Sequence, residues 1–290
     1  MQEQFRILPR RIHCGIIMEK GGEIMYALLH ELLSDRKGGE VFACFGVYHW
    51  CYILLAVLAA ILTAVKMGKL DAQNRERELD RWINLAFGLY IADFFLMPFA
   101  YEAIDLEKLP FHVCTAMCVA CFLSRRWAPL KPWQLPLATL GFVSNLVYLI
   151  YPAGIMWQGV HPLCYRVVQT LSFHAIMAVY GFLTLCYGQQ PVSCKNWRKD
   201  LAVITAMTGW AVLGNTLYNG KAGSYDHFFN WFFVVRDPFY ILPEAISPWV
   251  MPLVNIGVFF SAELLIITVF SRICCDKGTH TDIERRNHHA

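Results

Sequence analysis

The chain has 290 residues, of which 57% are hydrophobic, 14% aromatic and only 16% charged. A soluble domain averages about 25% charged residues, so this chain has too few polar groups to cover a surface that faces water. The composition favours a polytopic membrane protein and excludes an intrinsically disordered or collagen-like chain. A net charge of +3 in so apolar a chain is too small an excess of basic residues to bind the phosphates of a nucleic acid. We therefore expect no nucleic-acid partner.

The eleven cysteines do not form a metal-binding pattern. Seven of them fall inside or at the edge of apolar runs, where cysteine behaves as a small apolar packing residue. These are Cys51, Cys114, Cys118, Cys121, Cys186, Cys274 and Cys275. No C-x-x-C pair is followed by a second such pair, as a zinc ribbon requires. The sequence therefore predicts no metal site and no cofactor.

In chain order, the first predicted element is an amphipathic helix within an N-terminal segment of residues 1–46. Its apolar residues recur at i, i+3, i+4, i+7 and i+8, at Met25, Leu28, Leu29, Leu32 and Leu33. Such a pattern predicts a helix that lies on the membrane surface, and a helix packed on the spans is an equally good interpretation.

Seven apolar segments follow, and each reaches or approaches the ~20 residues that a spanning helix needs. They are residues 50–65, 82–101, 109–123, 133–151, 165–187, 201–218 and 249–273. The third is short and has Pro110 near its start, where the first turn of a helix tolerates a missing N–H. We therefore expect residues 47–275 to form one all-α transmembrane bundle of about seven helices, with residues 276–290 as a disordered tail.

The loops between these segments differ in basic charge. Fifteen Lys and Arg residues lie in the loops after the first, third and fifth spans and in the tail, whereas the opposite loops hold four. Because the cytoplasmic side retains Lys and Arg, this asymmetry predicts a multi-pass plasma-membrane protein with its amino terminus outside and its carboxyl terminus in the cytoplasm. Six Lys and Arg residues before the first span run against this prediction.

Polar side chains inside the spans are candidates for function, because ionisable and amide groups are expensive in hydrocarbon. Four spans place such groups in the half nearer the outside, at His112, Cys114, Asn145, Arg166, Gln169, His174, Asn215 and Asn219. A shared cavity open to the outer leaflet would satisfy all of them. Isolated interhelical hydrogen bonds are the alternative, and this alternative is favoured for Asn145 and Asn255 taken alone.

Two carboxylic acids, Asp93 and Glu263, lie nearer the middle of the bilayer with no Lys or Arg inside a neighbouring span. We expect each either to be protonated or to pair with a histidine. The function that such groups serve is a proton relay or a cation-coupled step.

Helix geometry limits which group can activate Cys114. Residues i and i+2 point about 200° apart on an α-helix, so His112 cannot act on Cys114 unless the helix is irregular after Pro110. His174, on another span, is the better candidate for the base. The aromatic segment 219–247 before the last span is either a lid over the outer cavity or an interfacial re-entrant segment.

Three motifs carry a resemblance to a known family. The motif Leu109-Pro110-Phe111-His112-Val113-Cys114, the pattern RxxQxxxxH from Arg166 to His174, and the pair Asn215 and Asn219 before an aromatic loop resemble the YwaF family of bacterial integral membrane proteins, over about residues 47–272. A eukaryotic relative of that family is a membrane acyltransferase that moves a polyunsaturated acyl chain between glycerophospholipids through a cysteine and a histidine.

The resemblance implies catalytic roles for His112 and His174. This chain departs from the pattern of the relative at the nucleophile. The relative has its cysteine immediately before the first histidine, where this chain has Phe111. Cys114 would have to take that role here.

We therefore expect an integral membrane protein with a lipid-accessible polar cavity in its outer half, possessing phospholipid acyltransferase or lipid hydrolase activity. The predicted catalytic residues are His174, His112 and Cys114, and membrane lipids are the predicted partners. The predicted substrate-binding residues are Arg166, Gln169, Asn145, Asn215 and Asn219. The alternative is a transporter, channel or lipid-binding sensor that uses Asp93, Glu263 and the histidines without catalysis, and the oligomeric state stays open.

Overall fold

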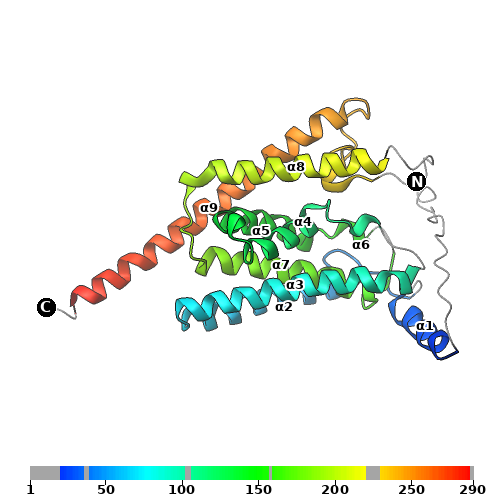
Figure 1. Ribbon diagram of the computed structural model, residues 1–290, viewed down its shortest axis with the longest axis horizontal. Helices are drawn as coiled ribbons and strands as arrows, with labels where there is room; N and C mark the ends of the chain where they lie inside the picture. Colours follow the sequence, from blue (N-terminus) through cyan, green and yellow to red (C-terminus); the bar gives the residue numbers. More distant parts are fainter. Residues whose placement is uncertain (1–19, 36–38, 102–105, 157–158, 220–228, 288–290) are drawn as a thin grey trace.

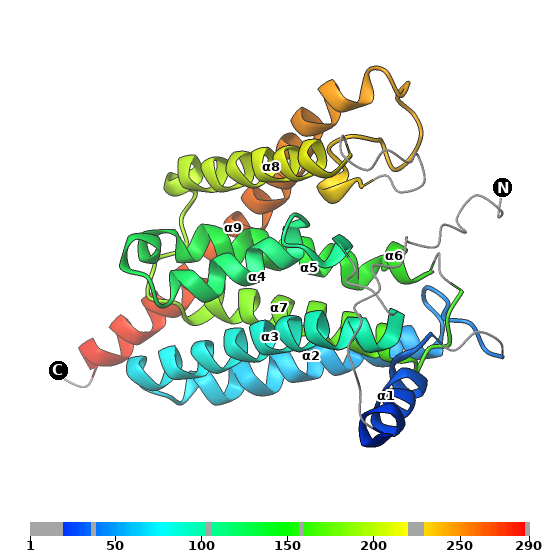
Figure 2. The same ribbon diagram turned by 45° about the vertical axis from the view of Figure 1, so that its right-hand side comes forward.

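A computed structural model describes residues 20–35, 39–101, 106–156, 159–219 and 229–287 of the chain (Figure 1). The described residues form helices and turns without a strand, which confirms the expected all-α bundle. Most of the long helices run side by side, α1 lies across one end of them, and α9 crosses them obliquely and extends beyond the opposite end (Figures 1 and 2).

The predicted amphipathic helix forms as α1 (Lys20–Leu33) and packs on a span. Nδ1 of His30 donates to the carbonyl of Phe99 at 2.9 Å. The opposite face of α1 exposes Met25, Leu28 and Leu32, each more than half accessible. One face of α1 therefore contacts the bundle while the other stays apolar and uncovered.

The next two helices run in opposite directions and both pack against α7 (Figure 1). α2 (Val47–Gly68) is apolar along its length, and its exposed residues include Leu54, Leu58 and Leu62, as expected of a helix that faces lipid. α3 (Ala72–Tyr101) begins ten residues before the apolar segment predicted from residue 82. Its first turns are charged and lie at the bundle end opposite α1.

The centre of the bundle is built from three helices: α4 (Val113–Ser124), α5 (Gln134–Ile150) and α7 (Tyr165–Tyr187). α7 packs against α2, α3 and α5, and α4 packs against α3 and α5. The shared core includes Cys118, Leu140, Met177 and Leu183, all fully buried. A short helix, α6 (Ala153–Met156), connects α5 to α7.

Two helices complete the bundle on one side. α8 (Trp197–Asn219) packs against α5 and α9, and α9 (Ser247–Asn287) crosses α5, α7 and α8. The connections between helices contain short 3₁₀ turns: η1 (Leu106–Lys108), η2 (Ala128–Trp133), η3 (Cys194–Asn196) and η4 (Trp231–Phe233). The structure continues α9 as a helix to Asn287, whereas the tail was expected to be disordered from residue 276.

Five helical segments are long and apolar enough to cross a membrane: Val47–Gly68, Ala128–Met156, Tyr165–Tyr187, Cys194–Asn219 and Ser247–Arg272. The protein is thus a multi-pass membrane protein by the length and composition of its helices. Of the seven predicted spans, the second lies within α3 and the third is the shorter apolar helix α4. At 1.5 Å per residue α4 is about 18 Å long, which is less than the thickness of a bilayer core.

The third span begins at Val113 and not at residue 109 as predicted. Pro110 lies in a turn before the helix, where its carbonyl accepts a hydrogen bond from Nε1 of Trp210 at 2.6 Å. His112 is the N-cap residue of α4, and its carbonyl accepts from the backbone N–H of Ala116. The irregular backbone after Pro110 therefore ends just before Cys114.

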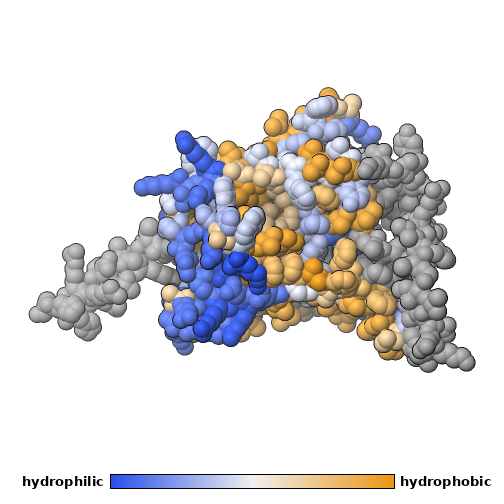
Figure 3. Space-filling view, in the orientation of Figure 1, coloured by the Kyte–Doolittle hydropathy of each residue, from blue (hydrophilic) through white to orange (hydrophobic). Residues whose placement is uncertain are grey.

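Charged residues gather at the end opposite α1 (Figure 3). The nearly buried guanidinium of Arg125 donates to Glu76 Oε2 at 2.7 Å and also pairs with Asp80. Glu78 pairs with Lys66 and Arg81, each at 2.8 Å. Burial raises the pKa of the Glu78 carboxyl, but the hydrogen bonds and charges of its two partners outweigh this and hold the pKa below its usual range.

Candidate functional site

A buried imidazole and a buried amide meet between α5 and α7. Nδ1 of His174 lies 2.7 Å from Oδ1 of Asn145, and the two side chains are 6% and 0% exposed. Nδ2 of Asn145 donates to the carbonyl of Gly141 at 2.7 Å, so the amide oxygen faces the ring. Nδ1 therefore carries the proton and donates it, and Nε2 holds a free lone pair.

Two aromatic rings fix the plane of this imidazole. The Tyr148 ring stacks on His174 at 3.8 Å between centroids with 14° between planes, and Phe173 meets it edge-on at 5.3 Å. Asn145 and Tyr148 are three residues apart on α5 and so project from the same face. The ring of His174 is thus oriented by one hydrogen bond and by packing on two sides.

Cys114 joins the same group from α4. Its thiol lies close enough to Ser144 for the two groups to interact electrostatically, and Nδ2 of Asn145 lies 3.5 Å from Oγ of Ser144. Cys114 and Ser144 thus lie beside the hydrogen-bonded pair of Asn145 and His174. Cys114 is half-buried and keeps some accessible surface, whereas Ser144 and Asn145 are buried.

His112 stands at the edge of this group. It is half-buried, and it and Lys108 are close enough for their charges to act on His174. The structure therefore brings all three predicted catalytic residues into one neighbourhood, around the His174–Asn145 pair.

Two predicted substrate-binding residues, Arg166 and Gln169, lie in the first two turns of α7. Nε of Arg166 donates to Oδ1 of Asp35, which follows α1, at 3.1 Å. Gln169 is buried, and its Oε1 accepts from Oγ1 of Thr170 at 3.2 Å. Arg166 is also close enough to act electrostatically on Tyr148, the ring that stacks on His174.

Asn215 and Asn219 lie in a second group, around Trp231. The Asn215 amide exchanges two hydrogen bonds with the backbone of Trp231, at 3.0 and 3.1 Å. Asn219 does the same with the backbone of Phe229, at 2.9 and 2.8 Å. These contacts hold the segment before α9 against α8.

A cavity of about 380 Å³ lies beside this second group. Its lining residues are Val212, Asn215, Thr216, Asn219, Val234, Val235 and Pro248. His112, Cys114 and His174 are not among them, so the structure separates the predicted polar residues into two groups.

Only part of the predicted aromatic lid can be described, because residues 220–228 lie outside the described residues. In the described part, Trp231 and Phe232 are buried, while Phe239, Tyr240 and Ile241 are more than three-quarters exposed. Asn255, expected to make an isolated interhelical bond, instead donates to the carbonyl of Phe232 at 2.7 Å. It too anchors this segment.

The expectation for Asp93 is wrong. Its Oδ2 lies 2.9 Å from Nζ of Lys108, and its Oδ1 accepts from the hydroxyl of Tyr165 at 3.1 Å. The partner comes from the turn before α4 and not from a span, which is why comparing spans does not find it. Glu263 is fully buried, and neither of its oxygens has a hydrogen-bond partner among the described residues.

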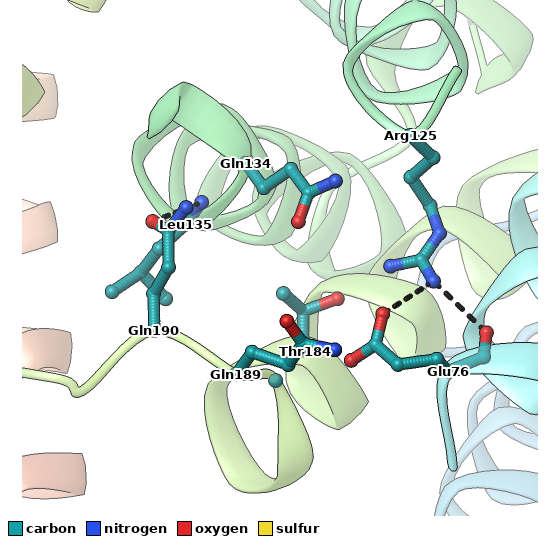
Figure 4. Close-up of a pocket in the computed structure, with 8 residues that line it drawn as sticks. Glu76, Arg125, Gln134, Leu135, Thr184, Gln189 and Gln190 are labelled. Carbon is teal, nitrogen blue, oxygen red and sulfur yellow. Dashed lines mark hydrogen bonds and ion pairs between the residues drawn. The ribbon is translucent and has the colours of Figure 1, made fainter. Parts of the chain in front are cut away.

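A second, very small cavity lies at the opposite end of the bundle, beside the Arg125 ion pairs (Figure 4). Its volume of about 10 Å³ suits one water molecule and no lipid. Within the described ranges no three His, Cys, Asp or Glu side chains gather as a metal site requires. The His174 group is therefore the best candidate for chemistry.

Sequence reasoning missed Ser144, Tyr148 and Asp35. The first two share a face of α5 with Gly141 and Asn145, at i, i+3, i+4 and i+7, and this spacing is the signal that could have found them. Asp35 follows the first helix, and the sequence holds no signal that pairs it with Arg166.

Comparison with known proteins yields one family. The matching family model is that of the TMEM164 family, over residues 44–268. No curated protein and no solved structure matches the chain. The resemblance to the YwaF family stays a prediction.

Proposed function

The chain belongs to the TMEM164 family, and from the geometry around His174 we propose that it is a phospholipid acyltransferase or lipid hydrolase. Cys114 is the proposed nucleophile and His174 the proposed general base. Acyl transfer needs a nucleophile, a base within reach of it, and a third group that orients the base.

The observation that carries the proposal is the buried hydrogen bond between His174 and Asn145, with Ser144 and the thiol of Cys114 beside it. It supports the proposal because three helices contribute to it and because the Asn145 amide leaves Nε2 of His174 free to accept a proton.

The proposed reaction has two halves. In the first, His174 takes the thiol proton of Cys114, the sulfur attacks the ester carbonyl carbon of a donor phospholipid, and the bond to the glycerol oxygen breaks. That oxygen takes the proton from His174, which leaves a thioester and a lysophospholipid.

In the second half, His174 takes the proton of an acceptor lysolipid hydroxyl, whose oxygen attacks the thioester. The thiolate leaves and regains the proton from His174. Water in place of the lysolipid gives hydrolysis. In a variant without a covalent intermediate, His112 is the base and acts directly on the lysolipid hydroxyl.

Arg166 is the proposed contact for the lipid phosphate, because a guanidinium fork matches phosphate geometry. Gln169, one turn further along α7, is proposed to bind the glycerol region. Asn215 and Asn219 have their amides engaged with the backbone of Trp231 and Phe229, so their proposed part is to shape the cavity beside them.

We also propose that the α1 end faces the outside of the plasma membrane and the Arg125 end the cytoplasm. The clustering of Lys66, Arg81 and Arg125 at one end of the bundle supports this orientation, since cytoplasmic loops retain basic residues.

Incubation of the purified protein with mixed phospholipids and an isotope-labelled lysolipid tests the activity. We expect mass spectrometry to find label in diacyl product with the wild type, and none with His174→Ala or Cys114→Ala. Cys186→Ala, which removes a half-buried thiol near the other end of α7, is the matched control and keeps activity.

Two other outcomes would change the proposal. Turnover that survives Cys114→Ala but not His174→Ala removes the cysteine and leaves histidine chemistry. Absence of turnover in every sample, with one lipid co-purifying reproducibly, favours the alternative of a transporter, channel or lipid-binding sensor. The carboxyl of Glu263, which has no hydrogen-bond partner in the described part of the chain, favours that alternative, which predicts dependence on Glu263 and on an ion gradient.

A further inference from the structure

Two acidic side chains are buried between α8 and α9. Sγ of Cys194, just before α8, lies 3.4 Å from Oγ1 of Thr268 on α9. The two helices pack together and run in opposite chain directions (Figure 1). Asp200, six residues after Cys194, and Glu263, five residues before Thr268, therefore lie at about the same level, some 8–9 Å from that contact. The charge of Asp200 is close enough to act on Glu263.

Neither carboxyl group has a partner that could balance a negative charge. Glu263 is 0% exposed and Asp200 is 2% exposed. Both oxygens of Glu263 and Oδ2 of Asp200 have no hydrogen-bond partner in the described part of the chain. An ionised carboxylate in such surroundings lacks water and a counter-ion, and two of them side by side repel each other. The pair is therefore stable only with a cation bound to it.

The basic residues of α8, η3 and α9 do not supply this cation. Lys199 is close enough to act electrostatically on Asp200, but its Nζ donates to the carbonyl of Pro132 at 3.2 Å. Among the described side chains, no ion pair joins Lys199 to either acid. The other basic residues that the structure describes in these three elements are exposed: Lys195, Arg198 and Arg272.

The other elements packed on α9 supply no cation either. α5 and η4 contain no Asp, Glu, Lys, Arg or His. On α7, Arg166 pairs with Asp35, and His174 is bonded to Asn145. The remaining ionisable residues of α7 are tyrosines and Cys186, which carry no positive charge. The cation of this carboxyl pair must therefore come from solution.

A proton is the cation that suits this pair. Ca²⁺ and Mg²⁺ take about six to eight oxygen ligands, whereas no third His, Cys, Asp or Glu joins these two acids within the described ranges. We propose that Asp200 and Glu263 form a proton-binding site between α8 and α9, in which Glu263 holds the proton and Asp200 exchanges it with the aqueous phase. Asp200 suits this role because it lies in the first turn of α8.

Infrared spectroscopy of the purified full-length protein tests the proposal, because a protonated carboxyl group and a carboxylate absorb at separate frequencies. At neutral pH we expect the wild type to show a band of protonated carboxyl that Glu263→Gln lacks. The band should disappear as the pH is raised, and it should shift in D₂O because the proton exchanges. Absence of this band from the wild type, or a band that neither pH nor D₂O changes, would overturn the proposal.

Two variants test whether the acids act as one site. Asp200→Asn removes the neighbouring charge, so the band of Glu263 should be lost at lower pH. At the pH that halves the wild-type band, we expect about fivefold less of it in this variant. Glu244→Gln, an exposed change in the segment before α9, is the matched control and leaves the titration unchanged. A titration of Asp200→Asn that equals the wild type or moves to higher pH would overturn the proposal.

The salt in the buffer separates a proton from a metal ion. We expect the band to stay the same when sodium chloride or magnesium chloride replaces choline chloride at constant pH. Loss of the band on this exchange would assign the site to a metal cation and overturn the proposal.

A hydrophobic carbodiimide gives a second measurement that requires no substitution, because it adds to protonated carboxyl groups and leaves a stable acylurea. Asp93 is the internal control, since it is 1% exposed but pairs with Lys108 at 2.9 Å. We expect peptide-resolved mass spectrometry to find the adduct on Glu263 and not on Asp93. An equal yield on the two residues, including none on either, would overturn the proposal. Neither measurement involves a lipid substrate, so the inference does not depend on acyl transfer.

Discussion

The amide of Asn145 decides which nitrogen of His174 can accept a proton. With Asn145→Ala, Nδ1 loses its acceptor and the ring is free to take the other tautomer or to rotate. We expect kcat in the label-transfer assay to fall about a hundredfold, within the range that a positioned base contributes, with KM little changed. Thr139→Val, a buried change two turns earlier on α5, is the control. An equal loss in both variants would show a packing effect only.

The ion pair of Asp93 and Lys108 predicts an asymmetric effect on stability. Lys108→Met leaves a carboxylate that is 2% exposed without its cation, and we expect the free energy of unfolding to fall by about 3–5 kcal/mol. Asp93→Asn combined with Lys108→Met removes both charges and recovers most of the loss. Thermal unfolding of the wild type, the two single variants and the double variant in detergent measures this cycle, and additive losses would contradict a coupled pair.

The sequence predicts which polar residues lie inside the helices better than it predicts their partners. Hydropathy and the cost of buried polar groups identified His174, Asn145 and Cys114 without any structure. The partners of Asp93 and Arg166 come instead from outside the spans, at Lys108 and Asp35, and a comparison of spans does not reach them. Tyr148 was not predicted as a site residue, because an aromatic residue in an apolar helix is usually there for packing.

The close contact of α5 and α7 depends on Gly181. A Cβ at this position would lie 2.6 Å from Cβ of Phe142 and 2.8 Å from the carbonyl of Ala138, so Gly181→Ala must push the helices apart. We expect a loss of about 1–3 kcal/mol in the free energy of unfolding, and reduced activity since the His174–Asn145 bond crosses this interface.

Gly209 is the matched control for this change. It lies in α8 with no atom within 4 Å of the added Cβ, so Gly209→Ala should be neutral or stabilising by up to about 1 kcal/mol. Thermal unfolding in detergent compares the two variants. A loss of similar size in both would mean that the helix interface does not depend on the small residue.

The turn before α9 is organised by one carboxylate. Asp237 accepts hydrogen bonds from the amides of Phe239, Ile241 and Leu242 at 2.8, 2.8 and 3.0 Å. The Phe239 amide first, and then the other two, hold the pKa of this carboxyl below its usual range. The stabilisation is therefore present above the unfolded pKa of about 4 and is lost as pH falls through the lower folded value.

Hydrogen exchange checks this turn. At neutral pH we expect the amides of residues 239–242 to exchange faster in Asp237→Asn than in the wild type, after correction for intrinsic rates. The difference should shrink as the wild-type carboxyl becomes protonated in acid. A difference that stays constant with pH would assign the effect to shape and not to charge.

The sequence predicts which segments form helices better than it predicts where each helix begins and ends. Apolar length placed α2, α5, α7, α8 and α9, because a spanning segment must satisfy its own backbone. α3 starts earlier than predicted since its charged first turns lie beyond the apolar region, where hydropathy gives no signal. α4 starts later because Pro110 lies in a turn bonded to α8, a tertiary contact that no local pattern contains.

At the scale of the whole molecule, hydropathy predicts that helices cross the membrane but not which of them touch. The pairing of α5 with α7 determines the site, and it depends on shape at Gly181 and on the Asn145–His174 hydrogen bond. These are properties of two surfaces, and composition along one segment does not contain them. The separation of the polar residues into two groups has the same origin.

The orientation of the bundle gives the last prediction. Cys194 is exposed before the first residue of α8, and Glu244 is exposed in the segment after its last residue. The two residues therefore lie at opposite ends of that helix. With the basic end in the cytoplasm, a membrane-impermeant maleimide should label Glu244→Cys on intact cells, and Cys194 only after permeabilisation. Peptide-resolved mass spectrometry separates these sites from the other thiols. Labelling of Cys194 alone on intact cells would invert the orientation, and it would place the Arg166 site in the cytoplasmic leaflet.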